Sequence, residues 1–488
     1  METQIRVLIL SHLLGLALLF PAQILPDSTI NATDMNSNDV FSKILRANLE
    51  SGELRYQGDI ENVRMKDRAF TCQNCLWSKS QNGTVLVPYE LSEDYNESDI
   101  ELISDAMLEF ATLSCVRFVP RQAETDYIAI RSENGCYSSV GRPGGPQLVS
   151  LLKSACLEFV IIQHELNHVL GFGHENSRSD RDDFITVAEA FILPEFQHNF
   201  EKVYTNSMGM EYDYSSIMHY GSGAFSNTPN QNTIVPKHNP NLQLGQQYGL
   251  SNLDISKINR LYECDACSTL LSTPSGILFS ANYPSPYPNN ASCVWLIRIP
   301  QGQVSLQFDS FDVQLSAKCS TDYVRVFDGA SKSSPLLLQR ACGRAKLPTL
   351  ISSSRWMLVE FISDGDRAMF GFKASFSTVQ CGGVFYTSPG NISSPEQPKN
   401  DCLFLISAPQ PQKVLLRIHT LNIEASNDCK CGYLAVYNGN STYSPLMHKF
   451  CEPTAPVKII SSGNSLLLKF YRDPETDAQG FSASFHFA

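Results

Sequence analysis

Two histidines and a glutamate stand at a spacing that can hold a metal ion and activate water. The segment reads His164-Glu165-Leu-Asn-His168-Val-Leu-Gly171-Phe-Gly-His174. On a helix, His164 and His168 share a face, so both imidazoles can bind one ion. Gly171 can end the helix without a Cβ penalty, which lets His174 supply a third ligand. Three imidazoles on one Zn²⁺ leave a position open for water, and Glu165 lies beside them as a general base.

The short HExxH pattern by itself also fits a pair of core histidines, so the wider pattern decides between the two interpretations. The extension to His174 and the downstream turn Ser216-Ile-Met218-His-Tyr220 together match the long metzincin signature. This combination favours a catalytic metal site. Three other histidines are expected to be structural or to lie on the surface, because the metal has its ligands already and no motif surrounds them: His219, His198 and His238.

Two helices are expected to position these groups. Ser98 is a capping residue ahead of a helix that runs to Leu113, since apolar residues recur there at helical spacing. Residues 156–170 form the second helix, which carries two of the histidines. It is apolar on most sides, so we expect it to be buried.

The composition is that of a folded chain from an oxidising compartment. Of 488 residues, 43% are hydrophobic and 18% charged, which excludes a mainly disordered chain and allows about two to four domains. The formal net charge is -12 and no basic run occurs, so nucleic acid and anionic lipid are poor candidate partners. Fifteen cysteines are typical of an exported protein, and their odd number leaves at least one without an intramolecular partner.

The first residues are expected to direct secretion. Arg6 precedes an apolar stretch over residues 7–20, which suits a signal peptide over residues 1–22 and is short for a membrane span. A membrane anchor is the alternative, but a polar stretch follows and no second span is seen. We therefore expect a secreted, extracellular protein of unknown oligomeric state. Six Asn-x-Ser/Thr sequons agree with export: Asn31, Asn82, Asn96, Asn290, Asn391 and Asn440.

From Cys267 onward, short alternating segments rich in Pro, Gly, Ser and Asn predict an all-β region. This region contains an internal repeat: residues 319–329 recur at 429–439, and residues 371–376 recur at 480–485. Cysteines, aromatic residues and glycines keep their register in both copies. Two β-sandwich domains of about 110 residues each are the simplest interpretation.

The cysteines of the β region pair within each copy and leave one over. The expected pairs are Cys267–Cys293, Cys319–Cys342, Cys381–Cys402 and Cys429–Cys451. Cys431 is the odd residue, because it falls opposite Thr321. Spacing alone does not settle the pairing of the six cysteines that precede this region, Cys72, Cys75, Cys115, Cys136, Cys156 and Cys264.

Residues 69–265 resemble the astacin zinc endopeptidases. The resemblance rests on the histidine segment, on residues 174–182, on the turn at 216–220 and on the closing residues 249–264. It implies that the three histidines bind one zinc ion and that Glu165 is the base. It also implies two disulfides, Cys115–Cys264 and Cys136–Cys156.

The same resemblance implies supporting roles for three further residues. Met218 would form a hydrophobic floor beneath the metal. Tyr220 would be a displaceable ligand that swings to stabilise the oxyanion, although without the turn it would be interpreted as a core aromatic residue. Glu175 would hold the new amino terminus of the mature enzyme through buried water.

The segment Tyr56-Gln-Gly58-Asp59 resembles the latency motif of astacin propeptides, whose aspartate takes the water position on zinc. A carboxylate is a competent ligand and Gly58 permits close approach, whereas a plain turn is the alternative. The usual aromatic residue here is Phe, and this chain has Tyr56. We predict a loosely structured propeptide over residues 23–68, latency through Asp59, and cleavage near residues 68 and 69.

Cys72 and Cys75 are interpreted as a short bridge near the mature amino terminus, similar to that of the six-cysteine hatching enzymes within the astacins. A redox motif would need a βαβ pattern, and a zinc knuckle would need a second cysteine pair; neither is present in the sequence. A thiol switch at the zinc is the less favoured alternative.

The β copies, residues 267–379 and 381–488, resemble CUB domains, which are β-sandwich modules of extracellular proteins. Many CUB domains bind Ca²⁺ through one Glu and two Asp residues. The first copy has Asp322 and Asp364 but Gln314 for the Glu, and the second has Glu424 and Asp473 but Gly432 for an Asp. Losing one anionic ligand weakens a calcium site, which argues against Ca²⁺ in either copy. Contacts to substrate or matrix through loops are the preferred interpretation.

The expected architecture is an α+β metzincin-type zinc protease domain followed by two all-β CUB sandwiches. An astacin domain followed directly by two CUB copies is most similar to vertebrate hatching enzymes, which implies egg-envelope glycoproteins as substrates. One alternative is a protease that processes extracellular matrix or growth factors. The other is a catalytically inactive CUB-type binding protein, although all the expected catalytic residues are present.

Overall fold

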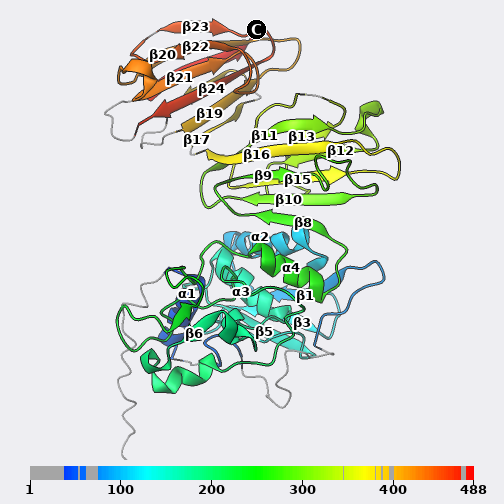
Figure 1. Cartoon of the computed structure of the whole chain (residues 1–488), viewed down its shortest axis with the longest axis vertical. Coiled ribbons are helices and arrows are strands. Elements are labelled where there is room, and N and C mark those ends of the chain that lie inside the picture. The colour runs from blue at the N-terminus through cyan, green and yellow to red at the C-terminus, as the bar shows by residue number, and fades with distance from the viewer. Residues whose placement is uncertain are drawn as a thin grey trace, which may run out of the picture.

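Three bodies follow one another along the long axis of the molecule (Figure 1). The computed structural model describes residues 38–52, 55–61, 75–344, 346–379, 381–385, 388–394, 401–454, 456–473 and 480–488. A domain of helices and one main sheet lies at one end, two β-sandwiches follow, and the C-terminus lies in the far sandwich (Figure 1). Among the described helices, none has both the length and the apolar composition needed to cross a bilayer.

The N-terminal domain places its strands in the order β2-β1-β3-β5-β4. Neighbours run parallel except β4, which pairs antiparallel with β5 at one edge. Helices and strands of this domain are α1 (Val40–Glu50), β1 (Val85–Leu91), α2 (Glu97–Leu113), β2 (Val116–Pro120), β3 (Tyr127–Arg131), β4 (Cys136–Ser138), β5 (Pro146–Leu151), α3 (Phe159–Val169), β6 (Ile185–Val187), β7 (Ile234–Pro236) and α4 (Asn252–Leu261). Short 3₁₀ turns join them at η2 (Glu175–Ser177), η3 (Arg181–Asp183), η4 (Glu189–Phe191) and η5 (Pro194–Phe200).

Helix α2 begins two residues before the predicted position. Its N-cap is Asn96, whose side chain accepts from the Asp99 backbone N–H, while the Asp99 side chain accepts from the Asn96 N–H. Ser98, which the sequence analysis took as the cap, donates its hydroxyl to Asn96 instead. Both candidate caps have an acidic residue three positions later, Asp99 for Asn96 and Glu101 for Ser98, so the spacing alone did not distinguish them.

Helix α3 is shorter than predicted, since it begins at Phe159 rather than at residue 156 and ends at Val169. Cys156 lies in a turn, where it forms a disulfide with Cys136 of β4. All eleven residues of the helix are buried, in agreement with its apolar pattern.

The prediction of a loosely structured leader was wrong for residues 38–52 and 55–61. Helix α1 lies in this segment, capped by Asp39, whose side chain accepts from the Ser42 N–H. Its apolar residues Phe41, Ile44 and Leu45 are buried against the protease domain. The signal was present in the sequence as an Asp before apolar residues at helical spacing.

Each β-sandwich consists of two packed antiparallel sheets with one parallel pair. In the first, the sheets have the orders β13-β12-β15-β10-β8 and β14-β11-β16-β9. Its strands are β8 (Cys267–Leu271), β9 (Ser275–Phe279), β10 (Ser292–Arg298), β11 (Gln303–Asp312), β12 (Tyr323–Phe327), β13 (Leu336–Ala341), β14 (Leu350–Ile351), β15 (Trp356–Ile362) and β16 (Gly371–Val379), with the turn η6 (Ala317–Cys319).

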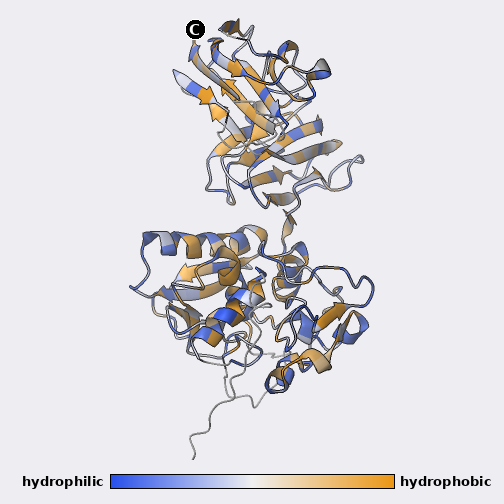
Figure 2. Cartoon of the chain, turned by 90° about the vertical axis from the view of Figure 1, so that its left-hand side faces the viewer, coloured by the Kyte–Doolittle hydropathy of each residue, from blue (hydrophilic) through white to orange (hydrophobic). Residues whose placement is uncertain are grey.

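The second sandwich repeats this arrangement, with the orders β17-β19-β24-β21-β22 and β18-β25-β20-β23. Its strands are β17 (Cys381–Phe385), β18 (Gly390–Ser393), β19 (Asp401–Ser407), β20 (Val414–Asn422), β21 (Gly432–Tyr437), β22 (Leu446–Phe450), β23 (Val457–Ile460), β24 (Ser465–Arg472) and β25 (Gly480–Phe487), with the turn η7 (Asn427–Cys429). Hydrophobic residues, drawn in orange, are frequent along the strands of both sandwiches (Figure 2).

The modules also pack on one another. On the first sandwich, strands β8 and β10 lie against helices α2 and α4 of the N-terminal domain (Figure 1). The second sandwich buries Leu403, Leu405 and Leu467 against Ile351 and Val379 of the first. Apolar contact therefore continues from one end of the chain to the other.

The core of the first sandwich is expected to depend on Phe361. Its side chain is 1% exposed and lies against the rings of Tyr287 and Phe372 at centroid distances of 4.9 and 5.8 Å. Phe361→Ala should lower the free energy of unfolding by about 3–5 kcal/mol, measured by denaturant unfolding followed by fluorescence. Phe279→Ala, at a residue that is 52% exposed, should change it by less than about 1 kcal/mol. Equal effects of the two variants would contradict the described packing.

Candidate active site

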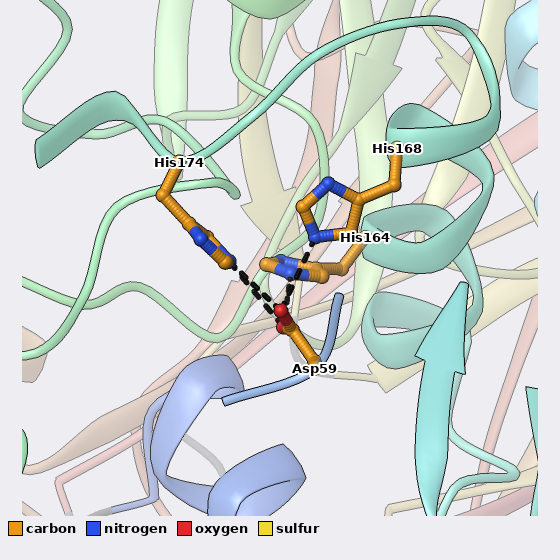
Figure 3. A group of neighbouring side chains, drawn as sticks. All are labelled: Asp59, His164, His168 and His174. Atoms are coloured by element: carbon orange, nitrogen blue, oxygen red, sulfur yellow. Dashed lines mark hydrogen bonds and ion pairs between the residues drawn. The ribbon is translucent and has the colours of Figure 1, made fainter. Parts of the chain in front are cut away.

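Three imidazoles and one carboxylate converge in the N-terminal domain (Figure 3). The side chains belong to Asp59, His164, His168 and His174, and all four are buried. Their potential ligand atoms lie within 4.8 Å of one another. No other cluster of three or more such residues occurs in the described part of the chain.

Helix α3 and the segments beside it position these groups. His164 and His168 project from one face of α3, and Gly171 ends the helix at φ 102°, so that the chain turns back and brings in His174. Asp59 comes from the leader, which lies along the edge strand β4. There the Ser138 N–H donates to the Asp59 carbonyl at 3.1 Å.

Backbone carbonyls fix the orientation of two rings. The Nδ1–H of His164 donates to the Ile217 carbonyl at 2.9 Å, and that of His168 donates to the Phe172 carbonyl at 2.7 Å. A neutral imidazole protonated at Nδ1 carries its lone pair on Nε2. Both Nε2 atoms therefore present acceptors to the centre of the cluster.

The arrangement fits a cation. Asp59 oxygens lie 2.9, 3.5 and 3.2 Å from the Nε2 atoms of His164, His168 and His174. Within the described residues, His168 Nε2 and Asp59 Oδ1 have no hydrogen-bond partner although both are buried. Acceptors that face one another in this way need an ion between them. Ligand atoms about 3.3 Å apart are what tetrahedral Zn²⁺ requires with bonds of about 2.0 Å.

Burial keeps the imidazoles of His168 and His174 neutral. It lowers the pKa of His168 and that of His174, the latter to about 4, and the negative charge of Asp59 offsets only part of this effect. At neutral pH these rings are therefore in the unprotonated form that binds metals.

Glu165 lies beside the cluster with one oxygen available. Its Oε2 accepts from the Ser138 hydroxyl at 2.9 Å, whereas its Oε1 is buried without a hydrogen-bond partner among the described residues. Burial raises the pKa of Glu165 well above its usual range, and the negative charge of Asp59 raises it further. Departure of the leader would remove the negative charge of Asp59 and its contribution to this rise in the pKa of Glu165. No pattern in the sequence pointed to Ser138.

Tyr220 is held by the leader. Its hydroxyl donates to the Gln57 carbonyl at 2.7 Å and lies 3.5 Å from His174 Nδ1. Its ring stacks on Phe41 of helix α1 at a centroid distance of 3.7 Å. No motif in the sequence predicted a contact of Tyr220 with Gln57 or Phe41.

Met218 and Glu175 lie next to each other in the protease domain. Met218 is 2% exposed, and its carbonyl accepts from the Glu175 N–H at 3.0 Å. The Glu175 carboxylate is buried and pairs with Lys257 at 2.7 Å and with Arg178 at 2.9 Å. The amino terminus expected as its partner lies outside the described residues. Lys257 was missed, because nothing local in the sequence relates it to Glu175.

The other histidines lie apart from the cluster. His219 is 2% exposed, donates from Nδ1 to the Tyr220 carbonyl, and accepts from the Tyr212 hydroxyl at 2.8 Å. His198 and His238 are exposed.

The Asp322 carboxylate in the first sandwich accepts hydrogen bonds from other groups of the protein. The Tyr287 hydroxyl donates to its Oδ2 at 2.6 Å, and the Asp364 N–H donates to its Oδ1 at 2.9 Å. The Gln314 amide, oriented so that its nitrogen faces acceptors, donates to the same Oδ2 at 3.3 Å. In the second sandwich, Gly432 has no side chain to offer, and Glu424 is exposed. A Ca²⁺ ion at Asp322 would have to replace these donors.

Six disulfides occur in the described residues: Cys115–Cys264, Cys136–Cys156, Cys267–Cys293, Cys319–Cys342, Cys381–Cys402 and Cys429–Cys451. Cys431 is in none of them. Cys72 lies outside the described residues, so the proposed Cys72–Cys75 bridge stays a prediction, as does cleavage near residue 68. Of the sequons, Asn82, Asn96, Asn290 and Asn391 are exposed and Asn440 is half-buried, whereas Asn31 lies outside the described residues.

The fold and the site define a class of protein, a metalloendopeptidase domain followed by two β-sandwich modules. Residues 73–263 match the Astacin peptidase family, and residues 267–376 and 381–485 each match the CUB domain. The chain is 45% identical over 458 residues to Embryonic protein UVS.2 of Xenopus laevis, covering 93% of this chain and 88% of that protein. This chain belongs to the astacin family of metalloendopeptidases and carries two CUB domains.

Two further proteins are similar to parts of this chain. Astacin-like metalloendopeptidase of Coturnix japonica is 45% identical over 350 residues, which cover 71% of this chain and 85% of that protein. High choriolytic enzyme 1, a hatching enzyme zinc-protease from the medaka fish Oryzias latipes, is a solved structure with 46% identity. It covers 39% of this chain and 95% of its own, with a TM-score of 0.38. The expected family, fold class and enzyme class are confirmed.

The cluster predicts a metal-binding result that can be measured directly. The uncleaved protein should bind one zinc ion per chain, determined by elemental analysis and by competition with a chromophoric chelator. Loss of an outer-shell partner weakens metal binding by about 10–100-fold. His168→Ala removes a direct ligand, so it should weaken zinc binding by more than this. His448→Ala, at an exposed histidine of β22, is the control and should bind zinc as the wild type does. Unchanged affinity in His168→Ala would exclude the cluster as the zinc site.

Proposed function

We propose that the protein is a secreted zinc endopeptidase made as a latent zymogen. In this proposal, His164, His168 and His174 hold the zinc and Glu165 is the general base. The observation that supports it best is the set of buried acceptor atoms that face one another around the position of a single ion. Astacin-family membership supplies the expectation that the ion is zinc.

The residues around the site suit peptide hydrolysis. When bound, zinc supplies a Lewis acid that polarises the substrate carbonyl and lowers the pKa of a water molecule. Glu165 Oε1 is available to accept the proton of the attacking water and to pass it to the leaving amine. The Ser138 hydroxyl holds the other carboxylate oxygen in place. Once freed from the Gln57 carbonyl, the Tyr220 hydroxyl could donate to the developing oxyanion.

The edge strand β4 suits an extended substrate. In the described form, its Ser138 accepts from the Glu61 N–H at 3.0 Å and donates to the Asp59 carbonyl. Removal of the leader would free this N–H and C=O for the backbone of a peptide, which is the usual way that an extended chain binds a sheet edge.

Latency is proposed to depend on Asp59 as the fourth ligand. The leader that carries it is held by buried polar contacts. The Gln57 N–H donates to the Asn199 side chain at 2.9 Å, and the Asn48 amide donates to the carbonyls of Gly58 and Cys136, each at 2.8 Å. These contacts, together with helix α1, would keep the carboxylate in the site until the leader is cleaved.

Secretion and the hatching role are the finer parts of the proposal. Disulfides in all three domains favour an oxidising, extracellular environment, as do the sequons. The hatching role, with egg-envelope glycoproteins as substrates, rests on the arrangement of one astacin domain and two CUB domains. The similarity to an embryonic protein over most of both chains supports it.

Catalysis by Glu165 predicts a specific loss of activity. The activated wild type should cleave an unfolded protein, and a zinc chelator should stop it. Glu165→Gln should lower kcat/KM by about 10²–10⁴-fold, because the proton acceptor is lost while the shape is kept. Glu452→Gln, at an exposed site in the second CUB domain, should retain full activity.

The same assay separates the proposed substrates. Isolated egg-envelope glycoproteins, a matrix-protein precursor and a growth-factor precursor are digested in parallel, with Glu165→Gln as the blank. Faster cleavage of the envelope supports the hatching role, and faster cleavage of a precursor overturns it while leaving the protease in place. No cleavage of any substrate by zinc-loaded, leader-free protein would favour a binding protein.

Latency through Asp59 predicts that Asp59→Ala is active without cleavage of the leader. The uncleaved variant should be more active than the uncleaved wild type by about tenfold or more. A tenfold change corresponds to about 1.4 kcal/mol, and the interaction of an ionised ligand contributes more free energy than this. A peptide assay, with a gel to show that the leader is intact, measures this. Glu61→Ala, which removes only a contact to the Ser139 hydroxyl, should stay latent. Unchanged latency of Asp59→Ala would disprove this role.

A further inference from the structure

The first CUB domain shares a hydrophobic core with the protease domain. Its β10 buries Leu296 against the protease helices and Trp295 in the interior of the sandwich, and β15 does the same with Leu358 and Val359. The sheet that contains these strands is therefore buried on both faces. A module on a flexible tether would keep one face in water.

The connection between the two domains is short. Only two residues separate Cys264, which is bonded to Cys115, from Cys267, which is bonded to Cys293. Cys264 and Cys267 are three residue steps apart, which an extended chain spans with at most about 11 Å. The first strand of the CUB domain must therefore begin beside the last helix of the protease.

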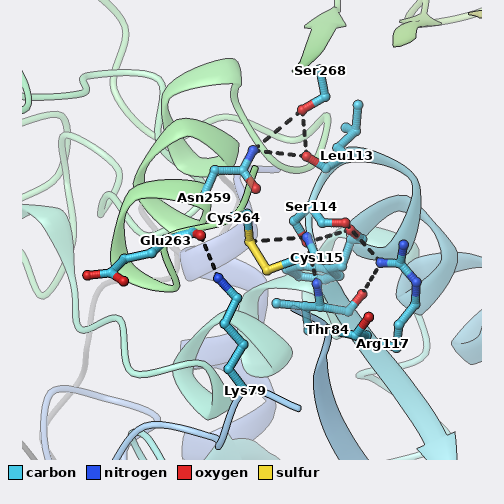
Figure 4. The surroundings of a disulfide bond; sticks show 12 residues. Lys79, Thr84, Leu113, Ser114, Cys115, Arg117, Asn259, Glu263, Cys264 and Ser268 are labelled. Atoms are coloured by element: carbon cyan, nitrogen blue, oxygen red, sulfur yellow. Dashed lines mark hydrogen bonds between the residues drawn. A yellow bond between two sulfur atoms is a disulfide. The ribbon is translucent and has the colours of Figure 1, made fainter. Parts of the chain in front are cut away.

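Hydrogen bonds next to this connection tie the first CUB strand to helix α2. Just after the connection, the Ser268 hydroxyl donates to the Leu113 carbonyl at the end of α2 at 2.6 Å (Figure 4). The Asn259 amide of α4 donates to the same carbonyl at 3.0 Å. The beginning of the CUB domain is thus fixed to two helices of the protease.

A buried ion pair crosses the interface. Arg298 at the end of β10 pairs through Nη1 with Glu109 of helix α2, and the two side chains are 3% and 0% exposed. Its Nη2 donates to the Leu250 carbonyl at 2.7 Å. The second oxygen of Glu109 has no hydrogen-bond partner among the described residues. Removing either partner would leave an uncompensated charge in the interior.

Two hydrogen bonds through Leu250 connect Arg298 to helix α3, which carries His164 and His168. The N–H of Leu250, whose carbonyl binds Arg298, donates to Gln163 Oε1 at 3.0 Å, and Gln163 directly precedes His164. The preceding residue, Gly249, has no room for a side chain. A Cβ there would lie 2.5 Å from Gln163 Oε1 and 2.8 Å from Arg298 Nη1.

A second contact reaches the start of the same helix. Phe159, the first residue of α3, packs against the ring of Trp356 at a centroid distance of 5.8 Å. The Arg355 guanidinium lies over both rings, 5.4 Å from Phe159 and 4.1 Å from Trp356.

We propose that the first CUB domain is part of the catalytic unit and that Arg298 is a positioning residue for the zinc helix. Through Leu250 and Gln163, it fixes the orientation of the helix that carries His164 and His168. The docking of the domain stands independently of the proposed function, whereas its effect at the metal rests on the zinc site proposed above.

A double-mutant cycle in the uncleaved full-length chain tests the docking. Arg298→Met and Glu109→Leu should each lower the midpoint of thermal unfolding by about 10 °C, because each buries an unpaired charge. The double variant should recover at least half of that loss. Arg417→Met, at an exposed arginine of the second CUB domain, should leave the midpoint unchanged. Small, additive effects would mean that both side chains are solvated and that the domain is not docked. If Arg298→Met does not fold, Glu109→Leu and the double variant decide the question, because the added Arg298→Met should then raise the midpoint of Glu109→Leu.

Zinc release tests the positioning role. Well below the unfolding midpoint, Arg298→Lys should speed the transfer of zinc to a chelator by about tenfold and lower kcat on a short peptide without changing KM. Phe361→Ala destabilises the same CUB domain without touching the protease, so it should leave zinc release unchanged. Equal rates in the two variants would overturn the positioning role. A wild-type chain that binds no zinc would instead disprove the proposed function, and the thermal cycle would still decide the docking.

Discussion

The protease domain is constrained by buried hydrogen-bond acceptors that face one another, namely the Asp59 carboxylate and the Nε2 atoms of His164 and His168. Carbonyls at Ile217 and Phe172 take the Nδ1 protons of two histidines and so direct their lone pairs inward. Such an arrangement is repulsive unless a cation occupies its centre. The helix, the glycine that ends it and the turn beneath it are the means by which the chain holds these acceptors together.

The leader adds a second negative charge to a site that contains Glu165. Under the proposed function, Asp59 would be the fourth ligand, and its negative charge also raises the pKa of Glu165, so one carboxylate would oppose catalysis in two ways. A single ligand would exchange with water, and the leader therefore needs an attachment of its own. Helix α1 provides it, since its apolar face is buried and Phe41 covers the ring of Tyr220.

Local patterns in the sequence were sufficient for much of the site and the fold. Residues four apart on a helix share a face whatever surrounds them, so His164 and His168 could be paired without a structure. The β repeat identified both sandwiches in the same way. Helix ends were less certain because competing caps lie close together, as with Asn96 and Ser98. The leader helix was missed although Asp39 and the apolar residues after it carried the pattern.

The tertiary structure decided the contacts that join distant parts of the chain. Asp59 reaches His164 across 105 residues, Lys257 reaches Glu175 across 82, and Arg298 reaches Glu109 across 189. Periodicity and capping describe only a few neighbouring residues, and they do not predict which buried charged groups form pairs. The sequence by itself identified the modules and predicted the metal ligands and the base. Only the packing of the whole chain decided that the leader covers the histidine cluster and that the first CUB domain lies against the protease helices. Those contacts depend on which surfaces become buried together.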